Sequence, residues 1–250
     1  MRVYACTERG TRHEKNGDAL LVGRRVLTEG EVRLTGSFAY LAVADGEGGL
    51  PFGEFASSFV LSALAARERI DGDALREINR ALLCEAREHF DGSPMATTLS
   101  GIAFTADTPV LFHIGNTRAY ALRRGKYLAA LTRDDTVVYR MYERGLLTKE
   151  ELPHAKSKNQ ICACFGGGDE SYFTPTVTPI IPELPLLLTS DGIHDHVDAE
   201  TLEEILTAVP DRAEAARLIL ALAREHGSTD DATLLICDPA PSQSGQAFTK

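Results

Sequence analysis

Residues 43–57 read VADGEGGLPFGEFAS, and this stretch decides how the chain is expected to fold. The apolar run FAYLAVA at 38–44 is typical of a buried strand, and Asp45 directly follows it. The glycines of GEGG allow a sharp turn and can present the Gly46 carbonyl as an oxygen ligand. A carboxylate at the end of a buried strand is costly unless a positive group lies beside it. A single Asp-Gly pair, by contrast, is most often only a loop corner.

Two more acidic positions lie at strand ends. Asp191 follows the apolar run LPLLLTS, while Asp230 and Asp231 precede the run ATLLICD. Mg²⁺ and Mn²⁺ prefer oxygen ligands, so carboxylates that converge from several strand ends can hold hard divalent cations. We therefore expect Asp45, Asp191 and Asp230 to form a metal site.

The remaining pattern favours an α+β fold. Further runs with strand character occur at 98–104, 110–115 and 118–125. Amphipathic helices are expected from about residue 53, from about residue 73, and over 212–226. Because strands and helices do not alternate strictly, we expect antiparallel sheets covered by helices.

Length and charge limit the possible functions. The 250 residues fit one large domain, expected over 1–238, with the Pro- and Ser-rich segment 239–250 as a disordered tail. The 36 acidic and 26 basic residues give a net charge of −10, which argues against nucleic acid as a partner. No apolar window resembles a signal peptide or a membrane span, so we expect a cytoplasmic protein without membrane contact. Five scattered cysteines fit reduced thiols in such a compartment.

Seven segments carry a more specific pattern. They are GTRHEKNGD at 10–18, VADGEGGLPFGEFAS at 43–57, MATTLSGIAF at 95–104, HIGNTRAYALRRGK at 113–126, LTRDDTVVYRMYERGLLTKEEL at 131–152, LLLTSDGIHDHV at 186–197 and STDDATLLI at 228–236. In this order they resemble the motifs of the protein phosphatase 2C family of metal-dependent phosphatases. The resemblance extends from about residue 6 to 238.

The resemblance implies both a fold and a reaction. The fold would be a central sandwich of two antiparallel β-sheets flanked by α-helices, with a flap segment over about 131–165. The reaction would be hydrolysis of phosphoserine and phosphothreonine in proteins through a water that bridges two divalent metals, Mn²⁺ or Mg²⁺. By motif position, Asp45 would bridge both ions, the Gly46 carbonyl would bind one, and Asp191 and Asp230 would bind the other. The substrate would be a phosphorylated protein, the counterpart a Ser/Thr kinase, and the chain a monomer.

Departures from the family pattern concern phosphate and further metal binding. The family's phosphate-binding Arg aligns with His13, and Arg12 lies one position earlier, so either residue could bind phosphate. If the two residues lay on a solvated N-terminal strand, neither would need a role in the site. The acidic or Gln residue expected before Asp18 is Gly17.

A third metal site is expected to be weak. Asn116 replaces an Asp that bacterial members associate with a third metal, and it keeps an oxygen ligand but loses the charge. Asp195 is retained, so Asp18, Asn116 and Asp195 are candidates for indirect metal contacts or a third ion. Asp231 replaces the family's Asn and either tunes the site or is only solvated.

Two other functions compete with an active protein phosphatase. One is a regulator or scaffold on the same fold with weakened catalysis, which Gly17, His13 and Asn116 favour. The other is a metal-dependent hydrolase of small phosphoesters. The intact set Asp45, Asp191 and Asp230 opposes the first of these.

Overall fold

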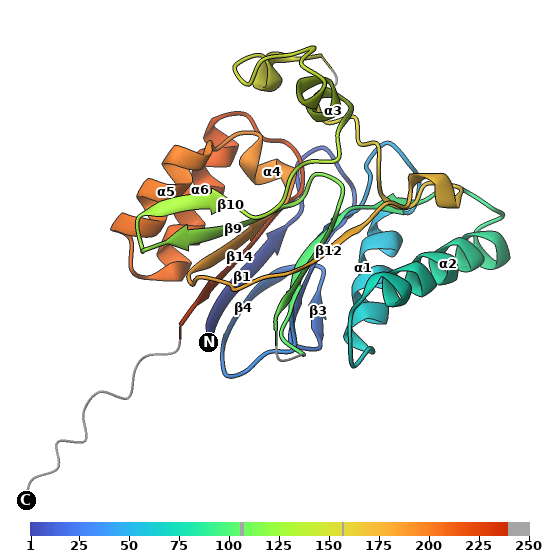
Figure 1. Ribbon diagram of the computed structural model, residues 1–250, viewed down its shortest axis with the longest axis horizontal. Coiled ribbons are helices and arrows are strands. Elements are labelled where there is room, and N and C mark those ends of the chain that lie inside the picture. Colours follow the sequence, from blue (N-terminus) through green and yellow to red (C-terminus); the bar gives the residue numbers. More distant parts are fainter. Residues whose placement is uncertain (106–107, 157, 240–250) are drawn as a thin grey trace, which may run out of the picture.

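Two six-stranded antiparallel sheets pack face to face in the computed structural model, which describes residues 1–105, 108–156 and 158–239. Figure 1 shows the two sheets at the centre with helices on both outer sides. The first sheet has the order β10 (Tyr127–Ala130), β9 (Arg118–Arg123), β13 (Leu186–Thr189), β14 (Ala232–Asp238), β1 (Arg2–Glu8) and β4 (Gly30–Thr35).

The second sheet contains the strand that ends in Asp45. Its order is β12 (Thr176–Pro179), β8 (Val110–Ile114), β7 (Leu99–Ala103), β5 (Tyr40–Asp45), β2 (Asp18–Val22) and β3 (Arg25–Leu27). A short ribbon of β6 (Ala96–Thr97) and β11 (Phe165–Gly166) lies beside it. β5 is therefore a central strand, which explains why FAYLAVA is apolar on both faces.

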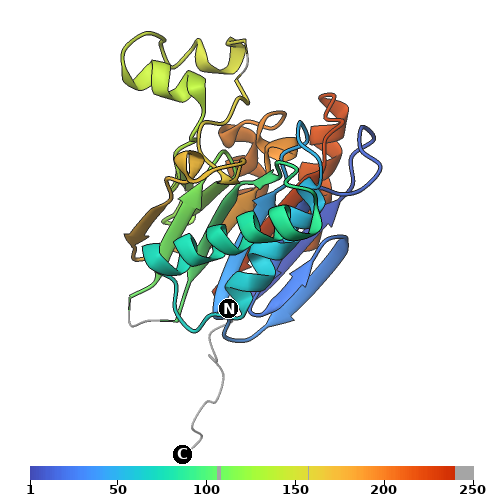
Figure 2. The same ribbon diagram turned by 90° about the vertical axis from the view of Figure 1, so that its right-hand side faces the viewer.

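Helices cover the outer face of each sheet. α1 (Gly53–Ala65) and α2 (Gly72–His89) cover the second sheet, and Figure 2 shows them in front of it. α4 (Asp191–His194), α5 (Ala199–Ala208) and α6 (Arg212–Glu225) lie on the first. Asp71 and Asp211 cap α2 and α6 by accepting hydrogen bonds from first-turn N–H groups, which fixes where these helices begin.

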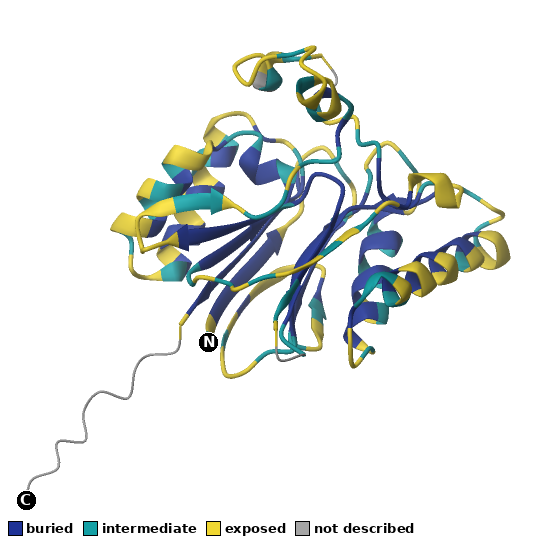
Figure 3. Ribbon diagram, viewed as in Figure 1, coloured by how far each residue is buried: buried dark blue, intermediate teal, exposed yellow. Residues whose placement is uncertain are grey.

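Strand alternation divides the core into three layers. On β2, Leu20 packs between the sheets, while its neighbour Leu21 packs against the helices on the outer face. The layer between the sheets also takes Val3 of β1 and Leu235 of β14. In Figure 3 the central strands of both sheets are buried, whereas exposed residues follow the outer sides of the helices and the edge strands β4, β10 and β12. Burying one such leucine side chain contributes about 1.5–3 kcal/mol.

The segment between β10 and β11 projects beyond one edge of the sandwich and carries α3 (Val137–Glu143) and a 3₁₀ turn at Leu152–His154 (Figure 1). We call residues 131–165 the flap. Its base is strand-like: Val137 N–H donates to Gln160 O at 2.9 Å, and Cys162 N–H donates to Asp135 O at 2.8 Å.

The expected antiparallel sandwich with flanking helices is confirmed. A single domain over 1–238 stays a prediction. The expected disordered tail, apart from Pro239, lies outside the described residues. In the described parts of the chain, every helix is too short or too polar to cross a bilayer.

Candidate metal centre

Acidic residues from both sheets meet at the edge of the sandwich from which the flap projects. Asp18 begins β2 and lies directly opposite Asp45, the last residue of the neighbouring β5. Asp191 follows β13 after Ser190 and begins α4. Asp231 immediately precedes β14, the antiparallel neighbour of β13. The chain thus directs carboxylates from the ends of four strands into one region.

Asp45 and Asp191 form the centre of this region. Both residues are half-buried, and each side chain affects the pKa of the other. Burial raises the pKa of Asp45 well above its ordinary range, and the charges of Asp18, Asp191 and Asp230 raise it further. For Asp191, burial and the charge of Asp195 raise the pKa to about 6. A bound cation would therefore stabilise the charged form of both carboxyl groups.

Asp18 is buried on β2, directly opposite Asp45 of the neighbouring strand. Ser190 Oγ donates to Asp18 Oδ2 at 2.6 Å, and Ser190 Oγ in turn accepts the Thr233 N–H at 3.0 Å. Burial raises the pKa of Asp18 to about 7, although its hydrogen bonds oppose this effect. Among the residues that the structure describes, Asp18, Asp45 and Asp191 have no ion pair with a lysine, arginine or histidine.

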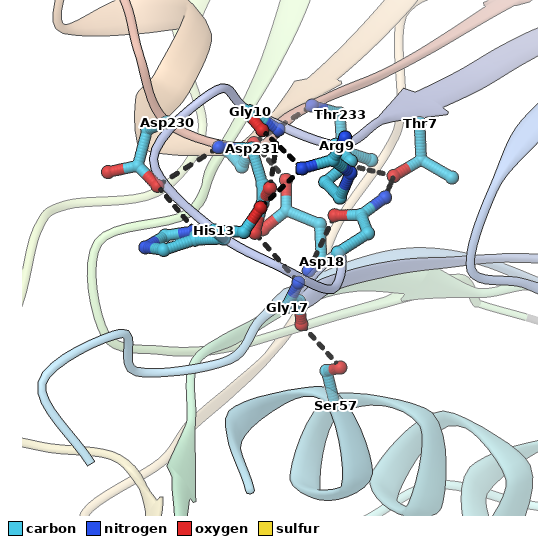
Figure 4. Close-up of polar contacts among 12 residues, drawn as sticks. Thr7, Arg9, Gly10, His13, Gly17, Asp18, Ser57, Asp230, Asp231 and Thr233 are labelled. Carbon is cyan, nitrogen blue, oxygen red and sulfur yellow. Dashed lines mark hydrogen bonds and ion pairs between the residues drawn. The ribbon is translucent and has the colours of Figure 1, made fainter. Parts of the chain in front are cut away.

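Asp230 lies at the margin of the group. Its charge raises the pKa of both Asp45 and Asp191, so it acts on the same region. Its Oδ1, however, accepts the Asp231 N–H at 3.0 Å and lies 3.5 Å from His13 Nδ1. Within the described chain, His13, Asp230 and Asp231 have ligand atoms within 4.8 Å of one another, and this arrangement is visible in Figure 4.

Asp231, for which the sequence left open either tuning of the site or simple solvation, is buried beside the acidic group. Its carboxylate is buried and accepts N–H bonds from Gly10 at 2.6 Å and Gly17 at 2.7 Å, besides lying 3.0 Å from His13 Nδ1 (Figure 4). A Cβ on Gly17 would lie 3.3 Å from Asp231 Oδ2. The two departures from the family motif, Gly17 and Asp231, therefore lie in direct contact, a pairing that the sequence analysis did not draw.

Arg12 and His13 lie in the loop 9–17 between β1 and β2, so the alternative of a solvated N-terminal strand does not apply. The change of face that a one-residue shift causes along a strand does not apply to this loop. Arg12 is exposed, and its N–H donates to Thr229 O at 3.1 Å. The half-buried His13 ring instead turns toward the acidic group, with Nε2 3.2 Å from where a Cβ on Gly48 would lie.

Gly46 has no room for a side chain. A Cβ on it would lie 2.2 Å from Gly53 O, since the turn packs directly against the start of α1. Gly46 N–H donates to Gly17 O at 3.1 Å, and Glu47 N–H donates to Ala96 O at 2.9 Å. The turn after β5 is thus fixed by backbone bonds on both sides, which sets the position of Asp45 and of the Gly46 carbonyl.

Asn116 and Asp195 lie around Asp191. Asn116 Nδ2 donates to Asp191 Oδ2 at 3.1 Å. Asp195 follows α4 one helical turn after Asp191, and its Oδ2 is contacted by Lys158 and Asn159 of the flap. Asn116 and Asp195 therefore adjoin the acidic centre through Asp191.

The donor set fits hard divalent cations. Two half-buried carboxyl groups that interact are stabilised by a shared proton or a cation, and three further Asp residues raise their pKa values. The available donors are carboxylate and carbonyl oxygens, which Mg²⁺ and Mn²⁺ prefer. The arrangement can therefore bind divalent cations and act on a phosphoryl group through them.

Comparisons with known proteins agree with this chemistry. Residues 9–225 match the model of the family described as "Protein phosphatase 2C". The serine/threonine protein phosphatase PstP of Mycobacterium tuberculosis is 32% identical over 98% of this chain, which spans only 46% of PstP. The serine/threonine phosphatase stp of Listeria monocytogenes is 27% identical over 82% of this chain and 86% of its own length.

Solved structures give the same result. The crystal structure of the M. tuberculosis phosphatase PstP superimposes with a TM-score of 0.79 at 31% identity, covering 95% of this chain and 99% of that one. A structure of the PstP catalytic domain in complex with two manganese ions gives a TM-score of 0.72 at 31% identity. It covers 95% of this chain and 99% of that one. Fold, motif order and family match lead to one assignment: the chain belongs to the protein phosphatase 2C family, whose members are metal-dependent phosphatases.

Proposed function

We propose that this protein hydrolyses phosphoserine and phosphothreonine in proteins, with two divalent cations held by Asp45, the Gly46 carbonyl, Asp191 and Asp230. The observation that carries the proposal is the convergence of half-buried Asp45 and Asp191 with buried Asp18 at one edge of the sandwich, where the charges of Asp18, Asp191 and Asp230 raise the pKa of Asp45. Such a cluster of carboxylates is unfavourable without a positive charge between or beside the groups. The manganese ions of the similar PstP structure support Mn²⁺ as the first metal to test, with Mg²⁺ as the alternative.

When bound, such cations lower the pKa of a water and neutralise charge on the phosphoryl oxygens. The chain's own residues set up this centre. Asp45, fixed by the turn at Gly46, is the candidate bridging ligand, and Asp18 lies opposite it on the next strand. Ser190 donates a 2.6 Å hydrogen bond to the Asp18 carboxylate, which fixes the position of this carboxylate behind the proposed ligands.

His13 is the better candidate for phosphate binding. Its Nδ1 faces Asp231 at 3.0 Å, which favours a proton on that nitrogen and keeps the ring beside the acidic group. Its other nitrogen lies over the turn that follows Asp45. Arg12, by contrast, is exposed. A phosphoprotein substrate would place its phosphate between this ring and the bound cations.

Hydrolysis of a phosphothreonine peptide by chelator-treated protein tests the proposal. Phosphate release is expected only after Mn²⁺ or Mg²⁺ is added and is expected to stop again with excess EDTA. Rapid turnover in EDTA would contradict it. Cation binding without turnover of any phosphopeptide would favour the regulator or scaffold, and turnover of aryl phosphates alone would favour a hydrolase of small phosphoesters.

A further inference from the structure

A lysine of the flap forms an ion pair with an aspartate beside the acidic centre. Lys158 Nζ lies 3.0 Å from Asp195 Oδ2, and Asn159 Nδ2 donates to the same oxygen at 2.6 Å. The Asp195 side chain is 14% exposed and that of Lys158 is 36% exposed. Because water reaches this pair only partly, salt screens it less than a fully exposed pair.

Asp195 couples this contact to the centre. Its N–H donates to Asp191 O at 3.0 Å, so the two carboxylates lie one helical turn apart. The charge of Asp195 is also one of the causes of the raised pKa of Asp191. Among the described residues, Lys158 is the one lysine or arginine that forms an ion pair with this acidic group. The other such contacts of the group come from His13, which lies beside Asp230 and Asp231.

The residues around Asp191 and Asp195 do not fit a third divalent cation. At Asp191, the Asn116 amide nitrogen donates to the carboxylate at 3.1 Å. At Asp195, two flap side chains already contact the carboxylate oxygen. Donor groups therefore stand where a third cation would require acceptors.

The same contact determines where the flap lies. Lys158 and Asn159 directly precede the strand-like base, where Gln160 O accepts the Val137 N–H and an isolated bridge joins Thr136 to Ile161. The segment that carries α3 extends away from both sheets (Figure 2). A contact between Asp195 and the residues just before the base therefore restrains the whole projecting segment.

We propose that Lys158 is a positioning residue whose ammonium group ion-pairs with Asp195, latches the flap onto the acidic centre and stands in place of a third divalent cation. The latch itself does not depend on catalysis. Its competition with a third cation rests on the proposed function.

Hydrogen exchange of the α3 amides in the full-length protein tests the latch. Lys158→Met is expected to speed exchange about fivefold, the equivalent of about 1 kcal/mol for a partly exposed ion pair. Exchange in the unaltered protein is expected to rise with NaCl between about 0.05 and 0.5 M, whereas exchange in Lys158→Met is expected to be insensitive to salt. Lys158→Arg should restore slow exchange, and Lys156→Met, at an exposed lysine of the same segment, should leave it unchanged.

Equal exchange in Lys158→Met and Lys156→Met would overturn the latch. A flap that loosens in Lys158→Met would support it even in a protein without phosphatase activity, so the latch and the proposed function fail separately.

Mn²⁺ stoichiometry, measured by calorimetry, tests the competition with a cation. Asn116→Asp combined with Lys158→Met is expected to bind one ion more than the unaltered protein, and more tightly than Asn116→Asp alone. If Asn116→Asp alone binds the additional ion as tightly as the double variant, Lys158 does not compete with a cation.

Discussion

Ser190 Oγ donates a 2.6 Å hydrogen bond to Asp18 Oδ2 and thereby joins the first sheet to the second at the acidic edge. Ser190 precedes Asp191, and Asp18 lies opposite Asp45. One hydrogen bond thus links the two strand ends that carry the central carboxyl pair. Since Asp18 is buried with a pKa of about 7, its charge is a cost to the metal-free fold at neutral pH.

This cost gives a pH-dependent stability. The pKa of Asp18 is raised from 3.8 to about 7, so its contribution to folding is fully present below pH 4 and is lost as pH rises to 7. Asp18→Asn removes this loss and is expected to increase the free energy of unfolding in EDTA by roughly 2–4 kcal/mol at pH 8. The gain should shrink toward pH 4.

Urea unfolding at pH 4, 5, 6, 7 and 8 measures this gain. Asp73→Asn, at a carboxylate whose side chain is 92% exposed, is the control. A gain that is the same at every pH would show that the Asp18 charge is not its source. Saturating Mn²⁺ should stabilise the unaltered protein most at high pH, because the cations bind deprotonated carboxylates.

Asp45→Asn is expected to lower phosphatase activity the most, by at least about a hundredfold in kcat, since this residue is the candidate ligand of both cations. The same change removes one of several neighbouring like charges. It should therefore raise the melting temperature of the chelator-treated protein while reducing the rise that Mn²⁺ produces. Paired melting curves with EDTA and with Mn²⁺ measure both effects. A variant that is destabilised in EDTA would show that Asp45 is not a repulsive partner of Asp191.

His13→Ala and Arg12→Ala distinguish the two phosphate candidates. His13→Ala should raise KM for a phosphothreonine peptide about fivefold to tenfold, as expected for loss of a hydrogen bond to a charged group. Arg12→Ala should change KM by less than about twofold, because Arg12 is exposed. A reversed order of the two effects, measured at saturating Mn²⁺, would assign phosphate binding to Arg12.

Asp231→Asn should destabilise the protein by about 1–3 kcal/mol, because an amide offers one acceptor oxygen where Gly10, Gly17 and His13 now share two. Urea unfolding in EDTA measures the loss. Gly17→Ala in the same assay tests the steric partner of this contact, since its Cβ would approach Asp231 Oδ2 to 3.3 Å. If Asp231→Asn is neutral, the buried carboxylate does not hold the loop 9–17.

Much of the fold could be predicted because its strands and helices carry clear local signals. β14 was expected over 232–238, where the structure has it, and α2 was expected from about residue 73 and begins at Gly72. α5 was missed, although Asp198 caps it and Leu202 and Leu206 recur on its buried face. β11 and β6 are two residues each, so their pairing depends on tertiary contacts that no local pattern records.

The candidate site likewise contains residues that local sequence signals could place and residues that they could not. Asp45 and Asp191 could be placed because each follows an apolar strand, and strand ends meet when antiparallel sheets pack. The role of Asp231 depends on the N–H groups of Gly10 and Gly17, which precede it by 221 and 214 residues in the sequence. The Lys158–Asp195 contact likewise joins the flap to α4. Such contacts between distant irregular segments leave no periodic pattern in a single sequence.

Location of the bound ions in a crystal grown with Mn²⁺, by anomalous scattering, tests the central claim most directly. Two ions are expected, both contacting Asp45, one with the Gly46 carbonyl and the other with Asp191 and Asp230. A crystal with Mn²⁺ bound only among His13, Asp230 and Asp231, or with no ion at Asp45, would contradict the account.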